Sequence, residues 1–240
     1  MSAGEKHREP IDRQRAGHPE LRSFGRRKGR KLSPRQQSLV DELLPSVRLD
    51  VKRGASITEQ FPPNLSRYWL EIGFGAGEHL LAQAQNNPSV GFIGCEPYLD
   101  GVVKVLSAIE RGKLDQIRVF PDDAREVLRW LPDASIERVF VLFPDPWPKR
   151  KHVRRRLINQ STIAELARVL RPEGELRLAT DIADYARTML VAAGSEPRFC
   201  WLAEGPGDWR QRPADWPPTR YEAKAKREGR SCCYLRFRRL

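Results

Sequence analysis

The sequence predicts an α/β fold in which a mostly parallel sheet carries helices on both faces. Three observations support this prediction. Five runs of strand length alternate with helical patterns between residues 68 and 193, as in consecutive βα units. The runs are largely apolar, as expected for strands buried on both faces. The chain has 240 residues, which suits one well-buried domain better than two.

Residues 1–30 precede this pattern and are rich in Lys, Arg, Gly and His, with few apolar side chains. Such a segment cannot bury enough apolar surface to offset the entropy lost on ordering. We therefore expect a basic, disordered tail over residues 1–30 and a single folded domain over residues 31–240, which ends in a basic segment.

The first helix is expected within "SPRQQSLVDELLPSV", residues 33–47. Ser33 is a suitable N-cap, and Pro34 is favoured at the first helical position, where its missing N–H is not needed. Three leucines then fall on one side of the helix. Residues 50–66, with Gly54 and a Pro-Pro pair, indicate a connecting loop.

The alternating region follows this loop. Strands are expected at residues 68–74, 90–96, 117–120, 137–143 and 175–180. Helices are expected at residues 78–85, 99–110, 124–131, 155–170 and 182–193. The C-terminal residues 231–238 indicate a further strand, antiparallel at or near an edge of the sheet.

The charge of the chain is segregated. The net charge is +12, with +7 in residues 1–35 and +7 in residues 210–240, so the middle carries −2. Within the middle, residues 149–156 form one dense basic run of six Lys and Arg without an acid. Three basic clusters around a near-neutral body favour a polyanionic partner, with nucleic acid the leading candidate. The alternative is a solvated tail and an exposed helix face.

The composition gives no sign of a membrane or secreted protein. No apolar run approaches the ~20 residues that cross a bilayer, and the charged N-terminus has no apolar signal-peptide core. The four cysteines show no CxxC spacing. They favour reduced thiols in a cytoplasm over a disulfide framework or a zinc site.

A glycine-rich turn follows the first strand in "LEIGFGAGEHLL". Gly73, Gly75 and Gly77 allow a tight turn with positive φ and a close approach of the backbone to a ligand. Their G-x-G-x-G spacing differs from the G-x-G-x-x-G of dinucleotide-binding proteins. Glu71 lies just before the glycines, where a carboxylate suits a cationic group better than a pyrophosphate.

Acidic residues follow the next two strands. Glu96 ends the second strand, 19 residues beyond Gly77, where a carboxylate can accept both hydroxyls of a ribose. Asp122 and Asp123 follow the third strand, where a carboxylate can accept a hydrogen bond from an adenine amine. An adenosine ligand with an ammonium and no phosphates is S-adenosylmethionine, so the sequence favours this cofactor over NAD or a cofactor-free scaffold. For Glu96 or Asp123 taken singly, a helix N-cap is an equal alternative.

The fourth strand leads into "PDPWPK", residues 144–149. Open α/β sheets bind ligands at the carboxyl ends of their strands, and three prolines restrict the backbone so that Asp145 keeps one direction. Trp147 offers a face on which a base can stack. Lys149 and the arginines at 154–156, expected to open the next helix, can engage phosphates. The alternative is a Pro-rich loop with Trp147 as a core plug.

Several blocks together resemble the bacterial tRNA (guanine-N7-)-methyltransferase family. They are "LEIGFGAGEHL", "GCEPYLDGV", "DDAREVL", "FPDPWPKRKHVRRRLI", "LATDIADYA" and "PTRYEAKAKREGRSCCYLRFR", which extend the resemblance from about residue 25 to the C-terminus. FPDPWPK and TRYE are its specific parts, since the glycine loop is shared with many methyltransferases. The resemblance implies a Rossmann-like class I methyltransferase fold with a seven-stranded sheet.

The resemblance also implies an activity and a set of site residues. The activity is transfer of the methyl group of S-adenosylmethionine to N7 of guanine 46 in the variable loop of tRNA. The implied cofactor contacts are Glu71, Glu96, Asp123 and Asp145, with Asp145 also catalytic. The implied substrate contacts are Lys149, Asp181, Thr219, Arg220, Tyr221 and Glu222. tRNA is the expected partner and no metal is expected, while monomer and homodimer both stay open.

Two alternatives use the same fold. A methyltransferase acting on an exocyclic amine of a base typically has a D/N-P-P-Y/F turn after the fourth strand, whereas this chain has Pro-Asp-Pro-Trp. A non-catalytic RNA-binding protein would be expected to have a damaged cofactor pocket, whereas the expected acids and glycines are all present.

Overall fold

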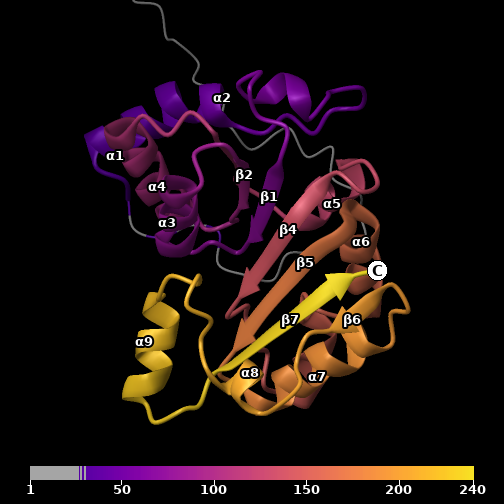
Figure 1. Cartoon of the computed structure of the whole chain (residues 1–240). Helices are drawn as coiled ribbons and strands as arrows, with labels where there is room; N and C mark the ends of the chain where they lie inside the picture. Colours follow the sequence, from indigo (N-terminus) through magenta and orange to yellow (C-terminus); the bar gives the residue numbers. More distant parts are fainter. Residues whose placement is uncertain (1–26, 28, 30) are drawn as a thin grey trace, which may run out of the picture.

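The computed structural model describes Arg27, Gly29 and residues 31–240, so the expected tail over residues 1–30 lies outside the described residues except at two positions. Seven strands form one sheet in the order β3-β2-β1-β4-β5-β7-β6 (Figure 1). Pairs from β3 through β5 are parallel, and β7 is antiparallel to both of its neighbours. This confirms the predicted fold and the antiparallel C-terminal strand near an edge. The strands are β1 (Tyr68–Ile72), β2 (Gly91–Cys95), β3 (Ile117–Phe120), β4 (Ile136–Leu142), β5 (Leu170–Thr180), β6 (Phe199–Trp201) and β7 (Cys233–Arg239).

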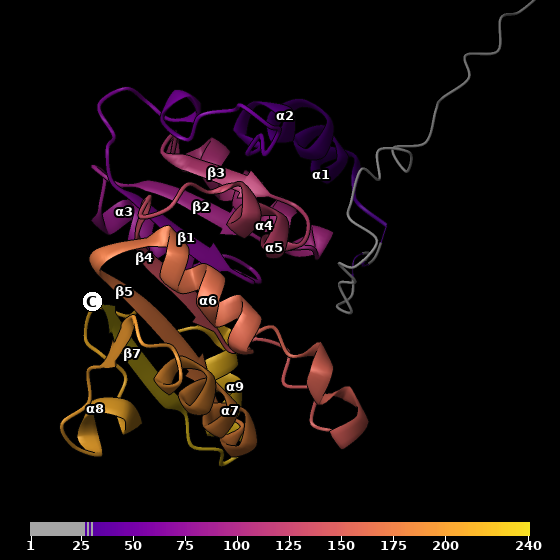
Figure 2. The ribbon, with the colours of Figure 1, turned by 90° about the vertical axis from the view of Figure 1, so that its right-hand side faces the viewer.

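Helices lie on both faces of the sheet, as Figures 1 and 2 show. α5, α6 and α7 pack on one face, and α3 and α4, with α1 and α2 beyond them, pack on the other. Each face buries its own apolar cluster, which is why the central strands are apolar on both sides. The α-helices are α1 (Pro34–Ser38), α2 (Leu44–Val47), α3 (Glu78–Asn86), α4 (Leu99–Gly112), α5 (Ala124–Trp130), α6 (Gln160–Val169), α7 (Ala183–Gly194), α8 (Gly207–Arg210) and α9 (Arg220–Arg227).

The first helix begins as predicted. Ser33 Oγ accepts a hydrogen bond from the N–H of Gln36 at 3.3 Å, and the Gln36 side chain accepts one from the N–H of Ser33 at 3.0 Å, which completes a capping box. A π-helical turn, Leu39–Leu43, joins α1 to α2. The helix therefore continues to Val47, the end that the sequence predicts.

The segment after β4 differs from the prediction. Arg154 and Arg155 do not open an α-helix, because they end the 3₁₀ helix η4 (Arg150–Arg155). α6 begins only at Gln160, where the Asn159 side chain accepts a hydrogen bond from the N–H of Thr162 at 3.1 Å. The cap at Asn159 thus starts a new helix four residues after η4 ends, where the sequence pattern indicates one helix from residue 155.

The edge of the sheet beyond β7 also differs. β6 has three residues and pairs with β7, a pairing that the short FCW stretch does not signal in the sequence.

The start of β5 differs from the prediction as well. β5 begins at Leu170, five residues before its predicted start at 175, and its pairing with β4 shifts register between Ile136 and Arg138. A bulge within β5 at Glu173, which has φ +64°, and Gly174 accommodates this shift. None of the helices formed by the described residues has the length and apolar composition that a bilayer crossing requires.

Candidate active site

A cavity of 440 Å³ lies at the carboxyl ends of the parallel strands. Figure 1 shows the arrowheads of β4 and β5 pointing toward the side of the molecule where α9 lies. The turns after β1, β2, β3 and β4 and the start of α9 all reach the cavity, so segments far apart in the sequence converge there. Its walls include these residues that the sequence predicts: Gly73, Gly75, Glu96, Asp122, Asp123, Asp145, Trp147, Arg220 and Tyr221.

The glycine turn after β1 is held closely by its neighbours. Gly75 has φ +58°, and a Cβ atom there would lie 3.1 Å from Cε2 of Tyr221. Gly77 has φ +83°, and a Cβ atom there would lie 2.3 Å from Cγ2 of Val105 in α4. Both positions therefore require glycine for backbone conformation and for space, which confirms the predicted tight turn with positive φ.

Glu96 links the turn after β2 to the glycine turn. Its carboxylate accepts hydrogen bonds from the N–H of Gly75 at 2.7 Å and of Tyr98 at 2.9 Å. Burial raises the pKa of Glu96, and the charges of Asp145 and Glu71 add to the rise, while the two backbone hydrogen bonds oppose it. The side chain is buried in the cavity wall, so it shapes the glycine turn and also faces the space beside it.

Asp123 caps α5, the alternative that the sequence leaves open for it. Its Oδ1 accepts a hydrogen bond from the N–H of Arg125 at 3.0 Å, and its Oδ2 pairs with Arg125 Nη2 at 2.6 Å. Burial alone would raise the pKa of Asp123, but the hydrogen bonds from Arg125 outweigh it and the pKa is lowered. Asp122 pairs with Arg27 at 2.7 Å. Both aspartates line the cavity, so ligand binding there stays a prediction.

Glu71 does not line the cavity. It lies in β1 and its Oε2 is 2.7 Å from Nδ1 of His79 in α3, with both side chains buried. His79 Nε2 lies 3.3 Å from Nε2 of Gln83, an amide nitrogen that can only donate, so the proton of the neutral ring faces Glu71. The sequence analysis missed His79, and the Glu-x7-His spacing across a strand and a helix gives no local signal.

The loop after β4 presents Asp145 to the cavity. Phe143 and Trp147 have φ values of +51° and +41°, which are strained for non-glycine residues and are typical of functional sites. No hydrogen bond or ion pair within the described part of the chain reaches the Asp145 carboxylate. The side chain is exposed toward the cavity, and partial desolvation by the surrounding protein raises its pKa. Trp147 is half-buried in the cavity wall, 5.0 Å from the Arg155 guanidinium, so it is not a core plug.

The basic run after this loop divides into two groups. Lys149, Arg150, Lys151 and Arg154 are exposed, and Figure 2 shows the salmon-coloured segment around residues 145–157 projecting from the body of the fold. Arg156 is only 3% exposed, so the expectation that it engages phosphates with its neighbours does not fit its burial. Lys149 precedes η4 and does not line the cavity.

The TRYE motif forms the start of α9, and its residues have different surroundings. Thr219 caps the helix by accepting a hydrogen bond from the N–H of Glu222 at 3.2 Å. Arg220 pairs with Glu78 of α3, and Tyr221 packs on Gly75. Glu222 is buried and pairs with Arg212 at 3.1 Å and with Lys226 at 2.5 Å, so its carboxylate is engaged within the protein.

Asp181 follows β5 and pairs with Arg230 at 2.7 Å, outside the cavity wall. Arg230 lies between α9 and β7, so the pair joins the end of β5 to the segment after α9. The structure therefore brings Arg220 and Tyr221 to the cavity, while Asp181, Thr219 and Glu222 support the segment that carries them.

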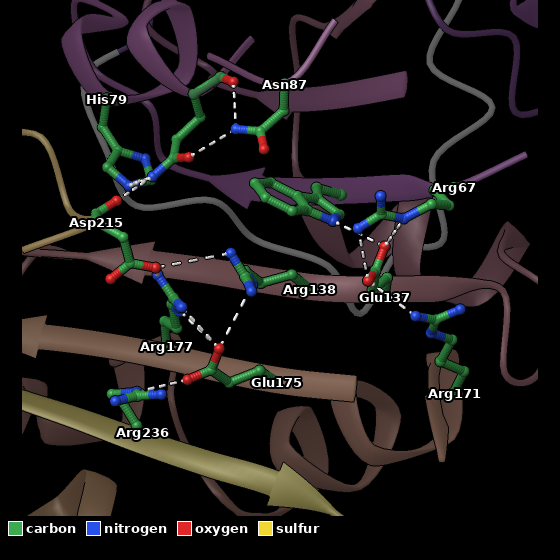
Figure 3. Close-up of polar contacts among 12 residues, drawn as sticks. Arg67, His79, Asn87, Glu137, Arg138, Arg171, Glu175, Arg177, Asp215 and Arg236 are labelled. Atoms are coloured by element: carbon green, nitrogen blue, oxygen red, sulfur yellow. Dashed lines mark hydrogen bonds and ion pairs between the residues drawn. The ribbon is translucent and has the colours of Figure 1, made fainter. Parts of the chain in front are cut away.

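A charged network on the face of β4, β5 and β7 that is turned toward α3 holds the loop before α9. Figure 3 shows Arg138, Arg177 and Arg236 around Glu175, with Asp215 beyond Arg177. Arg177 Nη2 lies 2.8 Å from Glu175 and its Nη1 lies 2.7 Å from Asp215. Gln83 Nε2 of α3 donates a hydrogen bond to the carbonyl of Asp215 at 2.8 Å.

This network was missed by the sequence analysis. Glu175 and Arg177 occupy alternate positions of β5, so they share one face of the sheet, and that alternation within "ELRLAT" is the available signal. Trp216 follows Asp215 and is buried, with the Arg177 guanidinium 5.4 Å from its ring. The loop that leads into α9 is therefore attached to the sheet by both charge and apolar packing.

Comparisons with known proteins agree with this geometry. A family model described as "Putative methyltransferase" matches residues 66–235. The tRNA (guanine-N(7)-)-methyltransferase of Rhodospirillum rubrum is 49% identical over 225 residues, which cover 92% of this chain and 88% of that protein. The protein of the same name from Nitrobacter hamburgensis is 50% identical over 220 residues, which cover 90% and 86%. The crystal structure of TrmN from Thermus thermophilus is similar in fold, with a TM-score of 0.50 at 15% identity over 73% of this chain and 45% of that chain.

Proposed function

The chain belongs to the tRNA (guanine-N(7)-)-methyltransferase family, and from this premise we propose that it methylates N7 of guanine 46 in the variable loop of tRNA. The methyl donor is S-adenosylmethionine. One observation carries the proposal: the Asp145 carboxylate, which pairs with none of the residues that the structure describes, faces a cavity that is also lined by the glycine turn and Glu96. The names of the relatives specify guanine N7 and give no support to methylation of an exocyclic amine.

The cavity suits a nucleoside-sized methyl donor. Its volume of 440 Å³ lies within the ~300–1,000 Å³ of small-molecule sites. Gly73 lines the cavity, and a Cβ atom there would meet nothing within 4 Å, so it leaves open space beside the glycine turn. Carboxylates stand at the strand ends, which suits hydroxyl, amine and sulfonium groups. Glu96 is proposed to accept the ribose hydroxyls, and Asp123 the adenine amine.

Glu71 is proposed to contribute negative charge beside the ammonium group of the donor. Its Oε2 faces His79, whereas Oε1 accepts no hydrogen bond from the described residues. The hydrogen bond from His79 Nδ1 to Oε2 holds the Glu71 carboxylate in one direction. Because Glu71 lies behind the cavity wall, its proposed role is electrostatic.

The chemical step requires alignment more than proton transfer. The sulfonium of S-adenosylmethionine supplies an electrophilic methyl group. Guanine N7 carries a lone pair and no proton near neutral pH, so no general base is needed and proximity is the main requirement. Positive charge develops on the purine as the methyl group arrives, and the ionised carboxylate of Asp145 stabilises it there. The half-buried Trp147 beside it offers a face for the base.

The basic segments are proposed to hold tRNA. Lys149, Arg150, Lys151 and Arg154 are exposed on the projecting segment, and Arg220 lies across the cavity on α9. N7 lies on the Hoogsteen edge, which tertiary pairing in folded tRNA engages, so the guanine is expected to be exposed or flipped for reaction. Contacts to phosphates make the affinity fall steeply with salt.

The test compares wild type with Asp145→Asn on two unmodified transcripts, one with guanine 46 and one with adenine there. Wild type is expected to label only the first from radiolabelled S-adenosylmethionine, as 7-methylguanosine. Asp145→Asn is expected to lose at least ~100-fold in rate with tRNA affinity nearly intact. Label on both transcripts would overturn guanine 46 as the methylated position. No label with wild type would overturn the proposed activity, and an active Asp145→Asn variant would remove Asp145 from catalysis.

A further inference from the structure

Arg156 is a buried cation whose guanidinium nitrogens all have partners within the fold. Its Nε donates to the carbonyl of Pro146 at 2.9 Å, its Nη1 to Oγ1 of Thr188 at 2.7 Å, and its Nη2 to Oδ2 of Asp184 at 2.5 Å. The guanidinium also lies 4.8 Å from the ring centre of Tyr185. These bonds engage three of its five N–H donors within the fold, and the side chain is only 3% exposed, which does not suit an open phosphate site.

The loop that Arg156 holds has few backbone groups that can donate hydrogen bonds, although the Trp147 ring also contacts His152 and Arg155. Three of the five residues 144–148 are prolines, which have no N–H to donate. Of the hydrogen bonds between described side chains and the backbone of these five residues, the bond from Arg156 to the carbonyl of Pro146 is the one present. Pro146 lies directly between Asp145 and Trp147, and Trp147 has a strained φ of +41°. A strained backbone keeps its conformation only where its surroundings enforce it.

The other partners of Arg156 belong to a rigid part of the molecule. Asp184, Tyr185 and Thr188 lie on α7, which packs on the sheet through the fully buried Tyr185. The hydroxyl of Tyr185 accepts a hydrogen bond from the N–H of Ile158 at 3.1 Å, so the segment after Arg156 is attached to the same helix. Arg156 therefore connects the loop after β4 to α7.

We propose that Arg156 is a positioning residue for methyl transfer, which holds Asp145 and Trp147 in their reactive directions by fixing the carbonyl of Pro146 to α7. The inference deepens the proposed function and rests on it. It assigns Arg156 a role different from that of the exposed cations beside it, although the sequence presents Arg154, Arg155 and Arg156 as one cluster. Displacement of a reacting group by ~1 Å costs about 100-fold in rate, so the expected effect is on the chemical step.

The experiment measures single-turnover methylation at saturating tRNA and S-adenosylmethionine, together with tRNA affinity at several salt concentrations. Arg156→Lys keeps the charge but cannot make the three bonds, so we expect its rate to fall by roughly 10- to 100-fold with unchanged tRNA affinity and salt dependence. Thr188→Val removes one partner from the α7 side and should lower the rate several-fold in the same way. Arg154→Gln should instead weaken tRNA binding and reduce the salt slope by about 1.

Arg187→Gln, an exposed substitution on α7 outside the site, serves as the control and should match wild type. The inference is overturned if Arg156→Lys keeps the wild-type rate, or if it loses tRNA affinity with a smaller salt slope. If Arg156→Lys fails to fold, the methylation rate of Thr188→Val tests the inference instead, and a wild-type rate in Thr188→Val overturns it. An inactive wild type would instead refute the proposed function, so the two failures are distinguishable.

Discussion

For the substitution Gly101→Ala in α4, helix propensity and tertiary packing predict opposite effects on stability. An alanine in a helix is favoured over glycine by about 1 kcal/mol, so propensity alone predicts that Gly101→Ala stabilises the protein. In the structure, a Cβ atom at Gly101 would lie 2.1 Å from the carbonyl oxygen of Gly75. Because that atom belongs to a backbone, the glycine turn must move by roughly 1 Å to restore an ordinary contact.

The magnitude follows from what this movement breaks. The N–H of Gly75 lies 2.7 Å from the Glu96 carboxylate, and a shift of about 1 Å takes it beyond hydrogen-bond distance. A hydrogen bond to a charged group contributes about 1.5–3 kcal/mol, which exceeds the ~1 kcal/mol gained from propensity. We expect Gly101→Ala to lower the free energy of unfolding by about 1–2 kcal/mol, and to weaken S-adenosylmethionine binding about tenfold or more.

Urea unfolding measures the first quantity and titration calorimetry with S-adenosylmethionine the second. Gly194→Ala is the matched control, since Gly194 ends α7 and a Cβ atom there meets nothing within 4 Å. The control should be neutral or stabilised by up to about 1 kcal/mol, with unchanged affinity. A Gly101→Ala protein that is as stable as wild type and binds the donor equally well would refute the close-packing argument.

The remaining predictions concern Asp145 and Asp215. Partial desolvation raises the pKa of Asp145, so kcat should fall with decreasing pH at a midpoint above the usual ~3.9, and a midpoint at or below that value would contradict this environment. A raised folded-state pKa gives stability that is complete below the unfolded pKa and lost as pH rises through the folded value. Asp145→Asn should therefore unfold in no less urea than wild type at pH 7, and a lower midpoint would attribute its inactivity to misfolding. Asp215→Asn removes one of two carboxylates from the buried Arg177. Glu175 remains and Asp215 is 56% exposed, so the free energy of unfolding should fall by about 1–2 kcal/mol. A fully broken buried ion pair would cost ~3–5 kcal/mol. The KM of Asp215→Asn for tRNA should rise more than its KM for S-adenosylmethionine, because the loop carries α9, and equal rises would contradict this assignment.

The sequence alone was sufficient for the sheet, for most element positions and for the edge at which the site forms. Apolar periodicity reports strands and helices from neighbouring residues, and parallel strands present their carboxyl ends at one edge. Residues just after strands, such as Gly75, Glu96 and Asp145, could therefore be assigned to one cavity before any contact was known. The sequence analysis missed β6 because three residues carry no periodicity. It placed the start of α6 too early because the cap at Asn159 lies inside the apolar pattern that was read as one helix.

The tertiary structure decided which of several similar side chains has which role. Arg154 and Arg156 are equivalent in the sequence, yet one is exposed and the other is enclosed by α7 and the carbonyl of Pro146. Glu71 pairs with His79 in the fold, and Asp123 caps a helix at the cavity wall, while ligand contacts of both stay a prediction. Partners of this kind come from segments that are distant in the chain. Burial and hydrogen bonding select among equally charged residues only after those segments have been brought together by folding.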